Sequence, residues 1–259
     1  MKGVVFLKKF KIIFVYILSL IAIVVLTIGI YMLIIAVQEK LFVSEEYLMW
    51  IFKYPASRLV FIYEIYLFAG FFYIFKKEFR EMGTGAYSAK DNFLKKHRRQ
   101  IIPIFITLNI ALFYVIVSAV TVITNSKIID YSFLSPQGRE YNYNDVVSIN
   151  TGVYGKKLYI PFTHSKGDFF YIIELKDGSK IDLTEVGGVK NEEHEVFIIE
   201  KLDSELVKMN VPKVSSMKNF KYSTEHLDKI YTDKIRNILE NSQALGWKML
   251  SRRAQCRRK

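Results

Sequence analysis

A run of 26 uncharged residues, from Ile12 to Val37, constrains this chain more than any other feature. About 20 apolar residues in a helix are enough to cross the hydrocarbon core of a bilayer. The apolar region of a secretory signal peptide is only about 7–15 residues long, and a small-residue cleavage site follows it. No A-x-A pattern follows this run. The sequence therefore predicts an uncleaved transmembrane helix over about 12–37.

Two further apolar runs predict two further spans. The second covers about 58–75 and follows Pro55 and Ser57, which are typical of a helix start. The third covers about 101–123 and carries Pro103 in its first turn, where the missing N–H group costs little. We therefore expect a membrane domain of three helices.

The boundaries of this membrane domain depend on two further segments. It is expected to extend over 1–124, with the strand pattern of the next domain running directly out of the third span. Between the first two spans lies the aromatic-rich segment 41–54. It is either an interfacial segment, with its rings at the level of the lipid headgroups, or the start of a longer second helix.

The net charge of +12 is concentrated around the apolar runs. The first eleven residues carry four lysines, and residues 76–99 carry eight basic and three acidic residues. Residues 125–245 carry 16 basic and 18 acidic residues, so the C-terminal part is near neutral and a nucleic-acid partner is excluded. The excess of lysine and arginine in the first eleven residues and in residues 76–99 places the N-terminus and the second loop in the cytoplasm. Three crossings then put the C-terminal domain outside a cell membrane, whereas a crossing by 41–54, or a second span that does not cross, would reverse this.

The pattern changes to that of a water-soluble α+β domain over 125–210. Alternating apolar residues predict strands, among them 127–133, and a turn is expected at Ser135–Gly138. Asp177-Gly178 predicts a hairpin between two further strands. A helix with an apolar face is expected over 192–209. A linker and a second amphipathic helix occupy 211–241, and we expect the basic tail 242–259 to be disordered.

Several strand patterns and a helix occur in an order known from other membrane proteins. They are VTVITNSKIIDYSF, YNYNDVVSI and FFYIIELKDGSKIDL, followed by the helix over 192–209. This order resembles the bacterial pleckstrin-homology-like (PH-like) domains that are attached to transmembrane helices in uncharacterised multi-pass proteins of Gram-positive bacteria. The resemblance implies an antiparallel β-sheet with closing helices that serves as an interaction platform. It implies no activity and no particular binding residues, and the second helix departs from the family pattern.

Glu64 is the sharpest candidate for a functional residue within the spans. An ionisable side chain inside a span is costly and faces other protein groups rather than lipid. Counting helix rise places Tyr114 and Thr27 at a similar depth, and Asn109 nearer the middle of the bilayer. We hypothesise that Glu64 bonds to Tyr114 or Thr27 and fixes the packing of the three helices. The alternative is a proton or ion relay.

The sequence holds no signature of catalysis. Cys256 is the only cysteine, so neither an intrachain disulfide nor a cysteine-based zinc site is possible, and no histidine spacing typical of a metal site occurs. We therefore expect no cofactor, no metal and no enzymatic activity. The expected function is that of an integral membrane protein whose PH-like domain binds a protein or an envelope component. The alternative is a small transporter or channel subunit that uses Glu64 and assembles as a homo-oligomer or with a larger partner.

Overall fold

The computed structural model describes residues 2–43, 46–75, 90–158 and 164–241. Its contacts divide the chain into two compact units. The first unit contains Met1–Lys40 and Pro55–Val117, and the second contains Leu41–Tyr54 and Ser118–Lys259. The segment 41–54 thus belongs with the C-terminal domain, and this domain begins at Ser118 rather than after residue 124.

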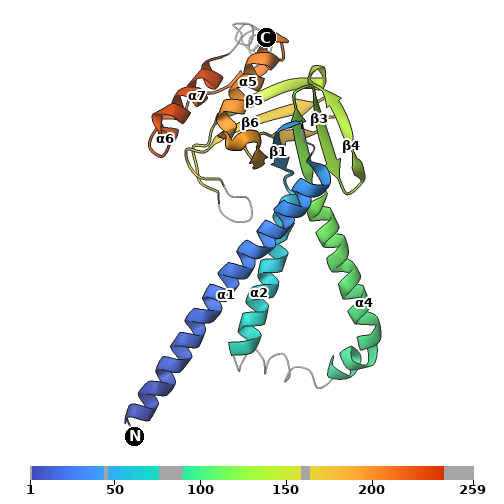
Figure 1. The fold of residues 1–259 in the computed structure, drawn as a ribbon, viewed down its shortest axis with the longest axis vertical. Coiled ribbons are helices and arrows are strands. Elements are labelled where there is room, and N and C mark those ends of the chain that lie inside the picture. Colours follow the sequence, from blue (N-terminus) through green and yellow to red (C-terminus); the bar gives the residue numbers. More distant parts are fainter. Residues whose placement is uncertain (1, 44–45, 76–89, 159–163, 242–259) are drawn as a thin grey trace, which may run out of the picture. The chain divides into compact units, whose positions relative to one another are not determined.

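The first unit is helical (Figure 1). Its elements are α1 (Lys2–Phe42), η1 (Ala56–Val60), α2 (Phe61–Phe75) and α4 (Lys90–Val117). Three stretches of the described residues are long and apolar enough to cross a membrane, namely Tyr16–Phe42, Ala56–Ile74 and His97–Val117. The prediction of three membrane-spanning helices is therefore confirmed by length and composition.

The third span ends earlier than the sequence suggested. Helix α4 stops at Val117, and Val120–Thr124, expected to be partly within the span, forms strand β2 with all five residues buried. A short, continuous apolar run has the same pattern in a buried strand and in a buried helix. β-Branched residues such as those of VTVIT favour the strand, because they pack well on a pleated surface.

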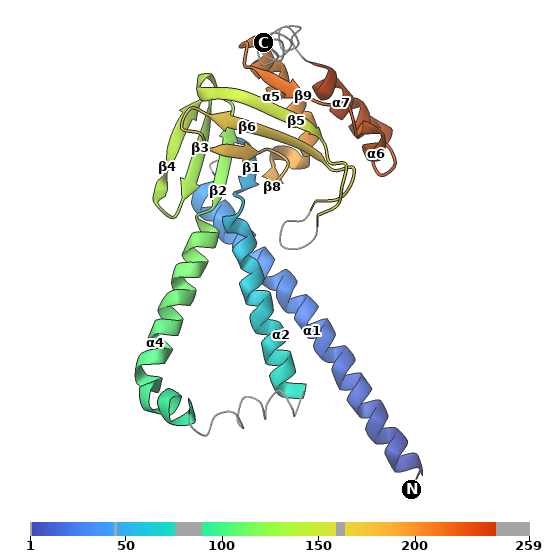
Figure 2. The same ribbon diagram turned by 180° about the vertical axis from the view of Figure 1, so that it is seen from behind.

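The described residues of the second unit form two β-sheets and three short helices. The strands are β1 (Tyr47–Phe52), β2 (Val120–Thr124), β3 (Lys127–Ser132), β4 (Ser135–Asn142), β5 (Val146–Val153), β6 (Phe169–Leu175), β7 (Lys180–Asp182), β8 (Val186–Val189) and β9 (Lys213–Ser215). The helices are α5 (Glu195–Lys208), α6 (Phe220–Ser223) and α7 (Lys229–Glu240), with single 3-10 turns η2 (Tyr143–Asp145) and η3 (Lys190–Glu192). One sheet has the order β4-β3-β2-β1-β8 and the other the order β7-β6-β5-β9 (Figure 2).

Strand β1 comes from the loop between the first two spans and lies inside the five-stranded sheet. It pairs antiparallel with β2, with Phe52 opposite Val120, and with β8, with Trp50 opposite Gly188. Both expectations for segment 41–54, an interfacial segment and a helix start, are therefore wrong. Met49, Trp50 and Ile51 of this segment are each at most 2% exposed, whereas Tyr54, after the strand, is 46% exposed.

One hydrophobic core joins the two sheets and the helices. It includes residues of β1, β2, β3, β5, β6 and β7. Helix α5 adds Val196, Ile199, Leu202 and Leu206, the face that the sequence predicted, and α7 adds Ile235, Ile238 and Leu239. The two helices pack against each other, as Figure 1 shows. An α+β domain with largely antiparallel sheets is thus confirmed.

The turns and the linker follow the prediction only in part. The hairpin at Asp177-Gly178 is present between β6 and β7, and Gly178 has a φ of +82°. The turn expected at Ser135–Gly138 lies instead at Phe133–Leu134, because Ser132 already pairs with Ser135. The stretch 211–241, expected to hold a linker and one amphipathic helix, contains β9, which pairs parallel with β5, and the helices α6 and α7. The tail 242–259 lies outside the described residues.

Candidate functional site

The three spans pack around a small apolar cluster in the first unit. Ile34 of α1, Val60 of η1 and Ile116 of α4 are buried there. Next to this cluster the Gln38 side chain is fully buried, and its Nε2 donates to the carbonyl oxygen of Ile116 at 3.1 Å. The hydroxyl of Tyr63 donates to the carbonyl oxygen of Asn109 at 3.4 Å. These two bonds link α1 and α2 to α4.

The structure places the four residues of the proposed intramembrane polar cluster on three helices, with Thr27 on α1, Glu64 on α2, and Asn109 and Tyr114 on α4. Glu64 is half-buried on α2, next to Tyr63. The amide of Asn109 donates to Phe105 in its own helix at 2.8 Å. Thr27 is half-buried and Tyr114 is 44% exposed.

Gln38 and Tyr63 make polar contacts between helices, and neither was a candidate from the sequence. Gln38 lies at the last charge-free turn of the first span, where a polar residue is easily assigned to a loop. Tyr31 of α1 lies within electrostatic range of Glu64 and Arg58. The role of Glu64 in helix packing stays a prediction.

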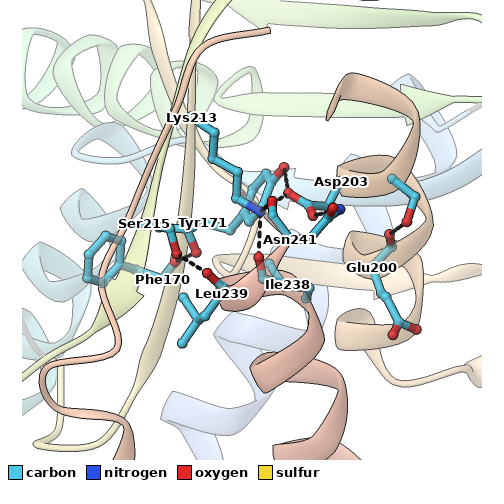
Figure 3. Close-up of polar contacts among 11 residues, drawn as sticks. Phe170, Tyr171, Glu200, Asp203, Lys213, Ser215, Ile238, Leu239 and Asn241 are labelled. Carbon is cyan, nitrogen blue, oxygen red and sulfur yellow. Dashed lines mark hydrogen bonds and ion pairs between the residues drawn. The ribbon is translucent and has the colours of Figure 1, made fainter. Parts of the chain in front are cut away.

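A second polar cluster is buried in the domain, around an ion pair between Lys213 of β9 and Asp203 of α5 (Figure 3). Their side chains are 3% and 1% exposed, and Nζ lies 2.5 Å from Oδ1. Tyr171 of β6 donates its hydroxyl to the same carboxylate at 2.8 Å, and Asn241 donates its amide at 2.8 Å. Each carboxylate oxygen of Asp203 therefore has a donor.

The same lysine closes the C-terminal end of α7. Its ammonium donates to the carbonyl oxygens of Ile238 and Asn241, and the neighbouring hydroxyl of Ser215 donates to that of Leu239 at 2.6 Å (Figure 3). The last carbonyl groups of a helix lack partners within the helix and carry its negative dipole end. A buried cation at this position satisfies both requirements. The cluster thus fixes α7 to β9 and α5.

The electrostatics of this cluster favour a structural role. Burial lowers the pKa of Lys213, and the hydrogen bond that its ammonium donates to Asp203 opposes this shift. Burial raises the pKa of Tyr171, and the charge of Asp203 raises it further. A surface pocket of about 270 Å³ lies beside the cluster, but its Glu200 carboxylate is already held by Lys234 at 2.7 Å and Asn237 at 2.9 Å. The arrangement therefore fits a structural link between α5, β9 and α7 better than a reaction site.

One sequence signal could have indicated this ion pair. Asp203 lies seven residues after Val196 and four after Ile199, which places it on the apolar face of the helix. A carboxylate on a face that is buried requires a cation nearby. The identity of that cation was not accessible, because Lys213 lies in a segment that reads as a linker.

A third cluster ties the loop between the first two spans to the C-terminal domain. Lys53, directly after β1, forms an ion pair with Asp130 of β3 at 2.5 Å and donates to the carbonyl oxygen of Tyr131 at 3.1 Å. Asp130 is 8% exposed and also accepts from the Thr121 hydroxyl at 2.7 Å. This ion pair lies where the chain leaves the sheet toward α2.

Neither the chemistry of these clusters nor comparison with other proteins assigns an activity. Among the residues that the structure describes, no three side chains of histidine, cysteine, aspartate or glutamate gather as a metal site. A scan against protein-family models finds no match, and searches of curated proteins and of solved structures find none either.

Proposed function

We propose that this chain is a multi-pass membrane protein that holds a non-enzymatic, PH-like interaction domain at the membrane surface. The observation that carries the proposal is the position of β1 inside the five-stranded sheet. The domain is joined to the spans by three chain segments, at Phe42, at Tyr54 and at Ser118. A domain tethered at three points suits a ligand found close to the membrane and suits transmission of force or position to the helices.

The pairing of β1 also supports a particular topology. Residues that share a sheet must lie on the same side of a bilayer, so Tyr47–Phe52 and the C-terminal domain share one compartment. The helices α2 and α4 then cross as a hairpin between them. With the lysine and arginine bias of the loops, the N-terminus lies in the cytoplasm and the domain lies outside.

Accessibility of single cysteines to a membrane-impermeant maleimide tests this topology in a Cys256→Ser background. We expect Glu46→Cys and Lys180→Cys, both exposed, to react in intact cells. Ser88→Cys, in the second loop of the sequence, is expected to react only after permeabilisation. Reaction of the first two on opposite sides would contradict the pairing of β1. Reaction of both only after permeabilisation would keep the pairing and reverse the sidedness.

Photo-crosslinking in native membranes tests the interaction role. A photoreactive residue at Val214 of β9 or at Ile230 of α7 would replace an apolar side chain that is 59% or 57% exposed. We expect one discrete crosslinked product from at least one position. If both positions crosslink to nothing while the protein stays folded and membrane-bound, the proposal of an interaction platform on this part of the domain is wrong.

A small transporter or channel subunit is the second candidate, and Glu64 is the observation that favours it. The residue is half-buried within the second span, beside the tyrosine that bonds to α4. In vesicles that contain the purified protein and a pH-sensitive dye, this function predicts proton-dependent flux that Glu64→Gln abolishes. If Glu64→Gln and Glu64→Ala both leave flux, abundance and thermal stability unchanged, neither a relay nor a packing role remains.

A further inference from the structure

The turn between β3 and β4 exposes two large apolar side chains. Leu134 is 76% exposed, the highest fraction of any large hydrophobic residue in the described chain, and Phe133 is 51% exposed. The stretch from Tyr131 to Gly138 carries no charged residue. The nearest acid, Asp130, is buried and paired with Lys53. Such a turn is unfavourable in water and suited to an apolar or interfacial environment.

The strand register places this turn at one particular end of the five-stranded sheet, where end refers to the ends of its strands. Thr121 lies opposite Asp130, so the end of β3 lies beside the start of β2. Phe52 lies opposite Val120, so the last residue of β1 lies at the same end of the sheet. The opposite end of the sheet carries the turn at Asn125 and Ser126, between β2 and β3.

The connections to η1 and from α4 leave from the end of the sheet that carries the apolar turn. Val120 follows the last residue of α4 by three positions and Phe52 precedes η1 by four, distances that a chain covers within about 11 and 14 Å. The ring of Phe42, the last residue of α1, lies 4.8 Å from that of Tyr131, two residues before Phe133. With the spans in the bilayer, the two short connections keep this end of the sheet close to the membrane.

We propose that Phe133 and Leu134 insert into the headgroup region of the bilayer and anchor the domain to its surface. Apolar and aromatic side chains partition into this region, where the apolar part leaves water and polar backbone groups stay hydrated. The insertion adds a fourth contact to the three covalent connections and sets the tilt of the sheet relative to the membrane plane. The proposal rests on the spans crossing the bilayer and is independent of the ligand of the domain.

Fluorescence of an environment-sensitive probe on single cysteines tests the anchor in the full-length protein. The probe is attached at Leu134→Cys or at Phe133→Cys, in a Cys256→Ser background, in vesicles of phosphatidylethanolamine and phosphatidylglycerol. Ser126→Cys is the matched control, because it lies in an exposed turn at the far end of β2, about 17 Å away. Each variant also carries Trp247→Phe, so that emission of the buried Trp50, measured before labelling, verifies that the variant is folded.

The anchor predicts blue-shifted emission at Leu134→Cys and quenching by spin-labelled lipid that is several-fold stronger than at Ser126→Cys. Equal, weak quenching at both sites would overturn the proposal. A blue shift at Leu134→Cys without lipid quenching would also overturn it, because the turn would then be covered by protein, either a second copy or a partner. Either failure, in a protein whose topology and photo-crosslinks are as expected, would leave the proposed function intact.

Discussion

A methyl group added at Gly187 tests the central feature of the fold, the insertion of β1 between β2 and β8. An ideal Cβ at this position would lie 2.0 Å from Cζ3 of Trp50 and 2.3 Å from its Cε3. Carbon atoms in contact are about 3.5–4.0 Å apart, so the ring would have to move by about 1.5 Å or more. Trp50 is 2% exposed and its ring meets that of Phe52 at 5.1 Å, which leaves it little room.

The expected loss of stability follows from the two ways in which the sheet can respond. Overpacking of a dense core costs about 1–3 kcal/mol, and complete loss of a buried tryptophan costs about 3–5 kcal/mol. We therefore expect Gly187→Ala to lower the free energy of unfolding by about 2–4 kcal/mol. In a Trp50→Leu background the same substitution should cost much less, since the overlapping atoms are gone.

Trp50 itself provides the assay. The sequence holds one other tryptophan, Trp247, and Trp247→Phe leaves Trp50 as the only emitter during urea unfolding of the protein in lipid nanodiscs. Heat-induced loss of monodispersity serves for the Trp50→Leu background. Gly29→Ala is the control, because a Cβ there meets no atom within 4 Å. An unchanged midpoint and emission spectrum for Gly187→Ala would refute the packing of β1 against β8.

Three further predictions concern the polar clusters and the response to pH. Lys213→Met should lower stability in thermal unfolding by about 3–5 kcal/mol, because Asp203 then stays buried without its cation; a loss near zero would contradict the structural link. Asp130→Asn should lower stability by about 1–2 kcal/mol. This loss is smaller than that for Lys213→Met because the partner of Asp130, Lys53, is 28% exposed. No loss in the same assay would mean that the ion pair between Lys53 and Asp130 does not stabilise the domain. Burial raises the pKa of Tyr154 to about 12, above the value of about 10 for an unfolded chain. The folded state thus retains a proton that the unfolded state loses. The contribution of Tyr154 to the free energy of unfolding is therefore complete below pH 10 and disappears as the pH rises through about 12. Tyr154→Phe should flatten the decline of the unfolding free energy in that window, and an unchanged pH profile would argue against it.

The outcome for β1 shows why local pattern was insufficient there. The segment YLMWIF reads as apolar and aromatic without alternation, which fits a membrane interface, a helix and a buried strand equally. Its strand partners are β2 and β8, which lie about 70 and 140 residues further along the chain. Pairing across such separations leaves no signal at short range, and proximity to two transmembrane spans favoured the wrong environments.

Long-range ion pairs were inaccessible for a similar reason. Asp203 and Lys213 are ordinary charged residues in sequence, and only the packing of α5, β9 and α7 removes them from water together. Likewise, the hairpin turn at Phe133–Leu134 depends on the register of β3 and β4, which overrode the Pro-Gln-Gly turn signal that follows. The exposure of Leu134 is a consequence of that register and could not be read from composition.

The sequence by itself determined the features that depend on local composition and period. These are the three apolar helices, the hairpin at Asp177-Gly178 and the buried face of α5, because bilayer thickness, turn geometry and helix period each act over a few residues to about 20 residues. Only the tertiary structure decided that the first loop is a strand of the C-terminal domain and that the end of β1, which leads to η1, lies beside the start of β2, which follows α4. Both depend on contacts between distant segments, whose free energy exists only once the core has formed.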